Sequence, residues 1–146
     1  MSRENYYLQL EDGLQFQDKV NEYMIKKHNL PIVFFTSAKR QFSGESFNGI
    51  EIKYDRRSLD TLNLFIPYKA RNKNGNWYDT GLNKNDNTIW FIIGNDEYAY
   101  MISKNILLGV IKNLHSVETL NGQGYLLPKT TAENICCLKL NFLNKE

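Results

Sequence analysis

Ionisable side chains occupy alternate positions in the segment IEIKYD, residues 50–55. Apolar or aromatic residues fill the positions between them, and this period of two is typical of a half-buried β-strand. Because successive side chains of a strand point to opposite faces, we expect Glu51, Lys53 and Asp55 on one face. Two carboxylates with a lysine between them can hold a divalent cation and a phosphate together. The alternative is the ordinary solvent face of an amphipathic strand.

The residues just before this strand decide which other acid can join it. Asn48 and Gly49 form a strong signal for a tight turn, and Glu45 precedes that turn. A three-residue loop (47–49) places Glu45 opposite Glu51, whereas a two-residue turn sends Glu45 to the other face of the hairpin. The sequence leaves both geometries open.

Basic residues gather around the same strand, although the whole chain carries a net charge of only +2. Between residues 39 and 73 there are eight Lys and Arg residues against four Asp and Glu residues, a local net of +4. A basic segment around a group of acids suits a surface that binds phosphates, and a solvated charged edge is the alternative. The expected phosphate contacts are Arg56, Arg57, Lys69 and Arg71.

Length and composition predict one globular domain, residues 1–146, with 42% hydrophobic and 23% charged residues. No apolar run is long enough to span a membrane, and the first residues lack the apolar region of a signal peptide. The only two cysteines, Cys136 and Cys137, are adjacent in a strand-like run, so they would point to opposite faces. We therefore expect no disulfide framework and a reducing, cytoplasmic location.

Hydrophobic periodicity predicts a leader over residues 1–11 and a helix from an N-cap at Asp12 to about His28. The other predicted elements, in order, are strands at 32–36, 50–55 and 62–66, a short helix within 77–87, strands at 88–93 and 98–102, a helix at 104–114 and a last strand at 135–142. This order predicts an α/β fold in which helices flank a central mixed β-sheet.

The same order of elements, together with the segments 49–56 (GIEIKYDR), 63–66 (NLFI), 80–82 (TGL) and 88–93 (TIWFII), resembles the PD-(D/E)XK nuclease superfamily. Within it, the small phage-type and restriction-like nucleases are the most similar, over roughly residues 12–114. The resemblance implies a restriction-endonuclease-like fold and an endonuclease that hydrolyses DNA phosphodiester bonds with Mg²⁺ or Mn²⁺. It also leaves a homodimer open, and it implies that Gln17 on the first helix reaches the water shell of the metal.

The superfamily motif fits this chain in two frames. In the first frame, residues 51–53 are the E-x-K triplet and Glu45 is the preceding acid. In the second frame, residues 50–55 form the earlier strand, and the later motif falls at 62–69, where Pro67 occupies the position of an acid and Lys69 that of the lysine. The loss of this ligand favours an alternative function, a non-catalytic nucleic-acid-binding or assembly protein on the same fold.

Side-chain roles follow from these frames. The expected catalytic residues are Glu51, Lys53 and Asp55, and the expected metal ligands are Glu45, Glu51 and Asp55. Residues i and i+4 of a strand are roughly 13 Å apart, so Glu51 and Asp55 cannot bind one ion without help. Glu45 or Gln17 is the expected source of the missing oxygen ligand.

Overall fold

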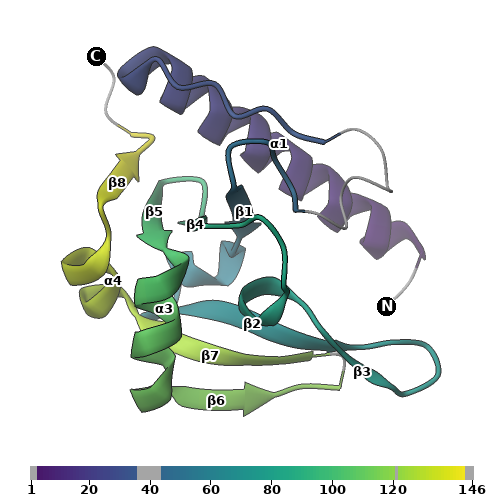
Figure 1. Cartoon of the computed structure of the whole chain (residues 1–146). Coiled ribbons are helices and arrows are strands. Elements are labelled where there is room, and N and C mark those ends of the chain that lie inside the picture. Colours follow the sequence, from purple (N-terminus) through teal and green to yellow (C-terminus); the bar gives the residue numbers. More distant parts are fainter. Residues whose placement is uncertain (1–2, 36–43, 121, 144–146) are drawn as a thin grey trace.

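The computed structural model describes residues 3–35, 44–120 and 122–143. A long helix, α1 (Arg3–His28), lies across one face of a four-stranded sheet, and a second four-stranded sheet packs against the other face (Figure 1). The first sheet has the order β1 (Ile50–Tyr54), β4 (Trp90–Gly94), β5 (Tyr98–Ser103) and β8 (Leu138–Asn141). The second has the order β3 (Trp77–Asp79), β2 (Asn63–Arg71), β7 (Gly122–Pro128) and β6 (His115–Glu118). The shorter helical elements are α3 (Lys104–Val110), α4 (Lys129–Ile135) and the 3₁₀ turns η1 (Arg56–Leu59), η2 (Gly81–Asn83) and η3 (Ile111–Asn113).

One apolar stripe holds α1 to the first sheet. Phe16, Val20 and Met24 recur every four residues and are buried in the core that also contains Ile50 and Ile52 of β1. The predicted end of the helix at His28 is confirmed, but the predicted start at residue 12 is wrong, because the helix begins at residue 3. Residues 3–11 are mostly good helix formers without proline, so helix propagation outweighs the capping tendency of the aspartate.

The first sheet is mixed, as predicted. Strands β1 and β4 are parallel, whereas the β4–β5 and β5–β8 pairs are antiparallel. The expectation of a single central sheet is wrong, because the predicted strand at 62–66 overlaps β2 of a second sheet in which all pairs are antiparallel. Periodicity reveals that a segment is a strand but not which partner it pairs with, so the sequence did not separate the two sheets.

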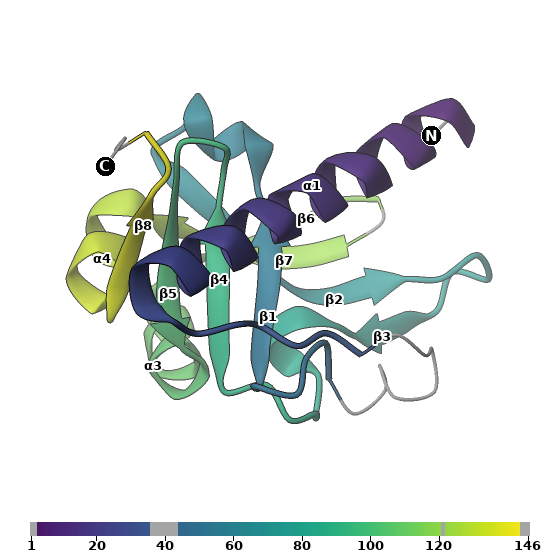
Figure 2. The same cartoon turned by 90° about the horizontal axis from the view of Figure 1, so that it is seen from above.

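A second core fills the space between the two sheets. Leu64, Ile66 and Leu127 of the second sheet pack there against Phe91 and Ile93 of β4. Strand β1 stands at the edge of the first sheet, and Figure 2 shows α1 and the β2–β3 hairpin extending beyond that edge on the same side. The free edge of β1 therefore lies on the side of the molecule where α1 and the β2–β3 hairpin extend outward (Figure 2).

Several local predictions need correction. The predicted helix within 77–87 is instead the short strand β3 followed by the 3₁₀ turn η2. In the described part of the predicted strand at 32–36, the structure has one isolated bridge, between Phe34 and Ser46. The predicted last strand is shorter, because α4 extends to residue 135 and β8 begins at residue 138. The polar stretch 37–43, which holds two of the basic residues counted above, lies outside the described residues.

Two further observations concern the cysteines and the helices. Cys136 and Cys137 both carry free thiols, and they lie in the connection between α4 and β8 rather than in the predicted strand. Among the helices of the described residues, none is both long and apolar enough to cross a membrane.

Candidate functional site

Strand β1 divides its side chains between two environments, as its alternating sequence predicts. Ile50, Ile52 and Tyr54 belong to or pack against the core beneath α1. Glu51 and Lys53 alternate with them, and their register partners on β4 are Phe91 and Ile93, which face the second sheet. Glu51 and Lys53 therefore share the face that looks toward the second sheet.

Glu51 is a buried carboxylate with incomplete hydrogen bonding. Its residue is 5% exposed, and its Oε1 atom lies 3.5 Å from the Nζ atom of Lys53. Its Oε2 atom is buried and has no hydrogen-bond partner among the described residues. Because a buried charge is costly unless it is paired and hydrogen-bonded, this oxygen marks a position where a cation or a bound water would be stabilising.

Glu45 reaches the same strand from the preceding segment. Its Oε1 atom accepts hydrogen bonds from the side-chain amide of Gln17, at 3.0 Å, and from the backbone N–H of Ile52, at 3.3 Å. Burial raises the pKa of Glu45 to about 7, the Lys53 ammonium opposes this shift, and the Glu51 carboxylate adds to it. Glu45, Glu51 and Lys53 thus form one electrostatic cluster, which Gln17 of α1 joins by its hydrogen bond.

The backbone before β1 brings Glu45 there without a hairpin onto that strand. Residues 44–47 pair instead with residues 33–35, through the hydrogen bonds from Phe35 N to Glu45 O (3.1 Å) and from Phe47 N to Val33 O (2.8 Å). The structure therefore follows neither of the two turn geometries that the sequence left open. The Glu45 side chain, rather than a paired backbone, runs along the free edge of β1.

This cluster has the donors that a small divalent cation requires. Mg²⁺ prefers oxygen ligands, retains several waters and commonly binds through only one or two carboxylates plus substrate phosphates. Glu45 and Glu51 supply two carboxylates, and the unpartnered Oε2 atom of Glu51 supplies a ready donor. No group of three or more His, Cys, Asp or Glu residues comes together within the described part of the chain. The residues therefore fit a two-carboxylate site.

Asp55, the third predicted ligand, belongs to a different set of contacts. Its Oδ2 atom accepts a hydrogen bond from the backbone N–H of Phe65 at 2.8 Å, and so the side chain is tied to β2. Asp55 also lines a cavity of about 620 Å³ together with Arg57 and Lys69. The structure thus brings Glu45, Glu51 and Lys53 together and joins Asp55 to two of the predicted phosphate contacts.

The other two predicted phosphate contacts lie elsewhere. Arg56 has an Nη1 atom 4.0 Å from Oδ2 of Asp12 on α1, and its side chain is largely exposed. The guanidinium of Arg71 lies 4.3 Å from the centre of the Trp77 ring on the β2–β3 hairpin. Of the four predicted arginines and lysines, Arg57 and Lys69 are the pair that the cavity brings together.

The second motif frame maps onto this cavity. Asp55, Pro67 and Lys69 all line it. Pro67 has no side-chain oxygen, and its backbone carbonyl lies so close to Gly81 that a Cβ atom there would be 2.3 Å from the oxygen. Asp55 is the one carboxylate among the described lining residues. The chemistry of this cavity therefore does not favour a divalent cation. The first frame, with Glu45 and Glu51, supplies more carboxylate oxygens.

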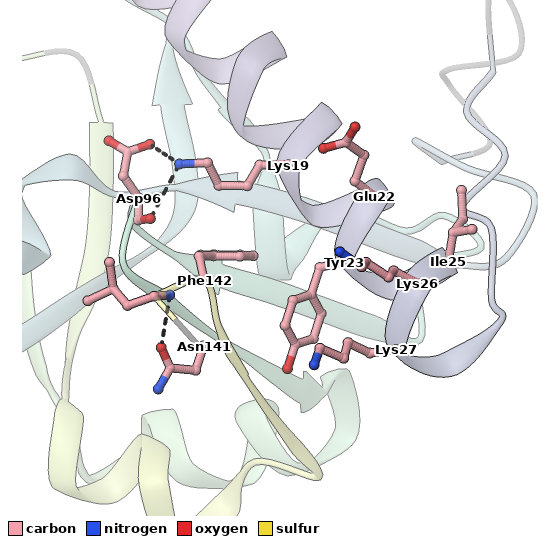
Figure 3. A pocket seen from close by; sticks show the side chains of 10 residues that line it. Lys19, Glu22, Tyr23, Ile25, Lys26, Lys27, Asp96, Asn141 and Phe142 are labelled. Carbon is pink, nitrogen blue, oxygen red and sulfur yellow. Dashed lines mark hydrogen bonds and ion pairs between the residues drawn. The ribbon is translucent and has the colours of Figure 1, made fainter. Parts of the chain in front are cut away.

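A larger hollow, of about 830 Å³, lies beside the C-terminal half of α1 (Figure 3). There the ammonium of Lys19 bonds to the Oδ1 atom of Asp96 at 3.4 Å and to its backbone oxygen at 3.3 Å, next to the rings of Tyr23 and Phe142. This hollow contains none of the residues singled out from the sequence. This hollow and the cluster of Glu45, Glu51 and Lys53 are therefore in different places.

Phe65 is an aromatic residue of the cavity lining that the sequence did not single out. It alternates with the buried Leu64 and Ile66 on β2, so it projects from the outer face of the second sheet into the 620 Å³ cavity. An aromatic side chain at an outward position of an amphipathic strand was the signal available in the sequence.

No family model, no curated protein and no solved structure matches this chain. The resemblance to the PD-(D/E)XK nucleases therefore stays an expectation from the sequence, which these comparisons do not test.

Proposed function

We propose that this protein is a nuclease that hydrolyses phosphodiester bonds of DNA with Mg²⁺ or Mn²⁺ bound at Glu45 and Glu51, on a restriction-endonuclease-like fold. One observation carries the proposal. The Oε2 atom of Glu51 is buried without a hydrogen-bond partner among the described residues, and Glu45 belongs to the same electrostatic cluster, with its pKa raised to about 7. A buried carboxylate with an unpartnered oxygen, coupled electrostatically to a half-buried acid of raised pKa, is typical of a cation site.

When bound, the metal supplies a polarised phosphoryl oxygen and a water of lowered pKa. The residues of the chain divide the remaining work. Glu45 and Glu51 hold the cation, and the amide of Gln17 and the N–H of Ile52 fix the orientation of the Glu45 carboxylate. Lys53, tied to Glu51 at 3.5 Å, lies where its ammonium can offset the negative charge that develops on the phosphate.

Substrate contacts come from the basic residues around this cluster. Arg57 and Lys69 share a cavity that opens from the same β1–β2 connection, and Arg71 is presented by the β2–β3 hairpin. Since the whole chain is close to neutral, these local cations supply most of the attraction for phosphates.

Cleavage of supercoiled plasmid in MgCl₂ tests the proposal directly. The wild-type protein should nick or linearise the plasmid, EDTA should stop it, and Glu51→Gln and Lys53→Ala should each lower the rate by at least about a hundredfold. Glu22→Gln on α1 and Lys112→Ala on η3 change the same charges at exposed positions and should leave the rate unchanged. Absence of cleavage by the wild-type protein, or cleavage that survives Glu51→Gln, contradicts the proposal.

A non-catalytic nucleic-acid-binding protein is the second candidate, and Pro67 favours it, because the second motif frame lacks its acid there. That candidate predicts DNA binding that depends on salt but not on a divalent metal. The same preparation therefore distinguishes the two, since retained DNA binding without metal-dependent cleavage supports the second candidate.

A further inference from the structure

The 620 Å³ cavity that contains Asp55 has a construction that the proposed cleavage site does not explain. It lies over the outer face of the second sheet, where residues of β2, β7 and β6 form its floor and residues of the β1–β2 connection form one wall. Its volume is within the range of roughly 300–1,000 Å³ that is usual for sites that bind small molecules. Such a cavity takes one ligand of moderate size.

An aromatic ring forms part of the floor, and a glycine of the neighbouring strand leaves room for it. The ring of Phe65 lies over Gly124 of β7, so close that a Cβ atom at residue 124 would be 2.4 Å from Cζ of the ring. Val117 and Leu126 line the cavity from the neighbouring strands. The glycine lets the phenylalanine ring lie on the sheet, where it offers an apolar, aromatic surface to a ligand.

A fixed hydrogen-bond acceptor stands beside this ring. Asp55 donates its N–H to the oxygen of Gly94 at 2.7 Å, and its Oδ2 atom accepts the N–H of Phe65 at 2.8 Å. The hydroxyl of Ser58 donates to the backbone oxygen of Asp55 at 2.7 Å. Since a carboxylate has about four lone-pair sites, this immobilised side chain retains capacity for N–H donors of a ligand.

Two cations complete the site. Arg57 on η1 and Lys69 on β2 line the same cavity as Asp55, and both are suited to phosphate oxygens. A ligand that satisfies all three features has a flat aromatic ring, an N–H group on the edge of that ring and an attached anionic group. A nucleotide has each of these.

We infer that this cavity binds one unpaired nucleotide, with its base against Phe65, an N–H group of the base donated to Asp55 and its phosphate at Arg57 and Lys69. The inference rests on the proposed function for the class of ligand and narrows the substrate to nucleic acid with an unpaired base. A base in a duplex is stacked on both faces and its N–H groups are paired, so it must leave the stack to enter. Asp55 follows Glu51 by four residues, so the cavity begins roughly 13 Å from the cleavage site along β1.

Binding is measured without cleavage, by fluorescence anisotropy of a labelled single-stranded oligonucleotide in EDTA with the Glu51→Gln protein. Deoxynucleoside 5′-monophosphates, inorganic phosphate and a blunt duplex serve as competitors. In this background Phe65→Leu removes the ring and Phe65→Tyr retains it. Tyr78→Leu removes an exposed aromatic residue of β3 that does not line the cavity, and Lys112→Gln is the charge control for Lys69→Gln.

The inference predicts that single strands bind and that mononucleotides displace them more effectively than inorganic phosphate or blunt duplex. Phe65→Leu should weaken binding at least about fivefold, whereas Phe65→Tyr and Tyr78→Leu stay within about twofold of the parent. Equal displacement by phosphate, equal displacement by duplex, or wild-type affinity in Phe65→Leu overturns it. Cleavage by the wild-type protein together with no effect of Phe65→Leu defeats this inference alone, and nucleotide binding without any metal-dependent cleavage defeats the nuclease proposal alone.

Discussion

Glu51 is proposed to bind the metal, but its buried carboxylate lowers the free energy of unfolding when no metal is bound. A buried carboxylate oxygen without a hydrogen-bond partner costs about 1–3 kcal/mol, and Glu51 has such an oxygen among the described residues. Glu51→Gln removes the charge at nearly constant volume. We therefore expect the variant to be at least as stable as the wild type in EDTA, by urea unfolding, while metal-dependent cleavage is lost. A variant that unfolds at much lower urea than the wild type would instead identify the Glu51–Lys53 ion pair as a structural one.

Glu45 makes the free energy of unfolding depend on pH. Its contribution falls as the pH rises, whereas that of most acids in folded proteins rises. Burial raises its pKa from 4.5 to about 7, so the folded protein retains a proton that the unfolded chain releases. The resulting stability is fully present below about pH 4.5 and is lost as the pH rises to about 7, up to roughly 3 kcal/mol. Urea unfolding in EDTA across this window measures the decline.

The matched variant for this prediction is Glu45→Gln, which cannot titrate. It should remove the decline between about pH 4.5 and 7 that is due to this residue. An identical decline in wild type and variant would assign the pH dependence to other groups.

At the scale of elements, the β2–β7 pair depends on the absence of a side chain at residue 124. A Cβ atom there would lie 2.4 Å from the Phe65 ring and 2.7 Å from the oxygen of Ile66. Gly124→Ala should therefore destabilise the fold by about 1–3 kcal/mol. Gly109→Ala is the control, because Gly109 is inside α3 with no neighbouring atom within 4 Å, and it should stabilise by roughly 0.5–1 kcal/mol. Thermal unfolding of both variants checks the contrast, which equal melting temperatures would refute.

The elements also show what the sequence could predict. The stripe of Phe16, Val20 and Met24 and the alternation of β1 are local patterns, and each predicted its element and its buried face. The predicted start of α1 is wrong because aspartate is favoured as an N-cap but is also tolerated inside a long helix. Segment 77–87 was misread because its turn residues suit a short strand with a 3₁₀ turn as well as a helix.

Less of the candidate site than of the fold could be predicted from the sequence. The residue types and the face shared by Glu51 and Lys53 follow from β1 alone. The approach of Glu45 does not, because it depends on residues 44–47 pairing with residues 33–35, a long-range choice that no local pattern encodes. Likewise, the attachment of Asp55 to β2 requires the second sheet, which the sequence did not distinguish from the first.

At the scale of the whole molecule, the proposed activity uses two regions, the edge of β1 and the cavity over the second sheet. Residues 51–57 connect them. Glu45, Glu51 and Lys53 lie at the free edge of the first sheet, and Asp55 and Arg57 lead into the cavity over the second sheet. Helix α1 and the β2–β3 hairpin extend past the same edge (Figure 2).

The dependence of nucleic-acid affinity on salt concentration measures how many phosphate contacts the protein makes. The net charge of +2 gives little long-range attraction, so each local cation should contribute a separable part of the binding. Lys69→Gln should lower the slope of log affinity against log salt by about one, and Lys112→Gln should leave that slope unchanged. Equal slopes for both variants would show that the Lys69 cavity does not bind phosphate.

The binding of Mn²⁺, followed by titration calorimetry at about pH 8, tests the location of the metal most directly, because it does not depend on knowing the preferred substrate. The wild-type protein is predicted to bind the ion. Glu45→Gln and Glu51→Gln should each weaken binding by at least about tenfold, and Asp55→Asn should leave it unchanged. No binding by the wild-type protein, or loss of binding in Asp55→Asn with full binding in Glu45→Gln, would contradict a metal centre at the edge of β1.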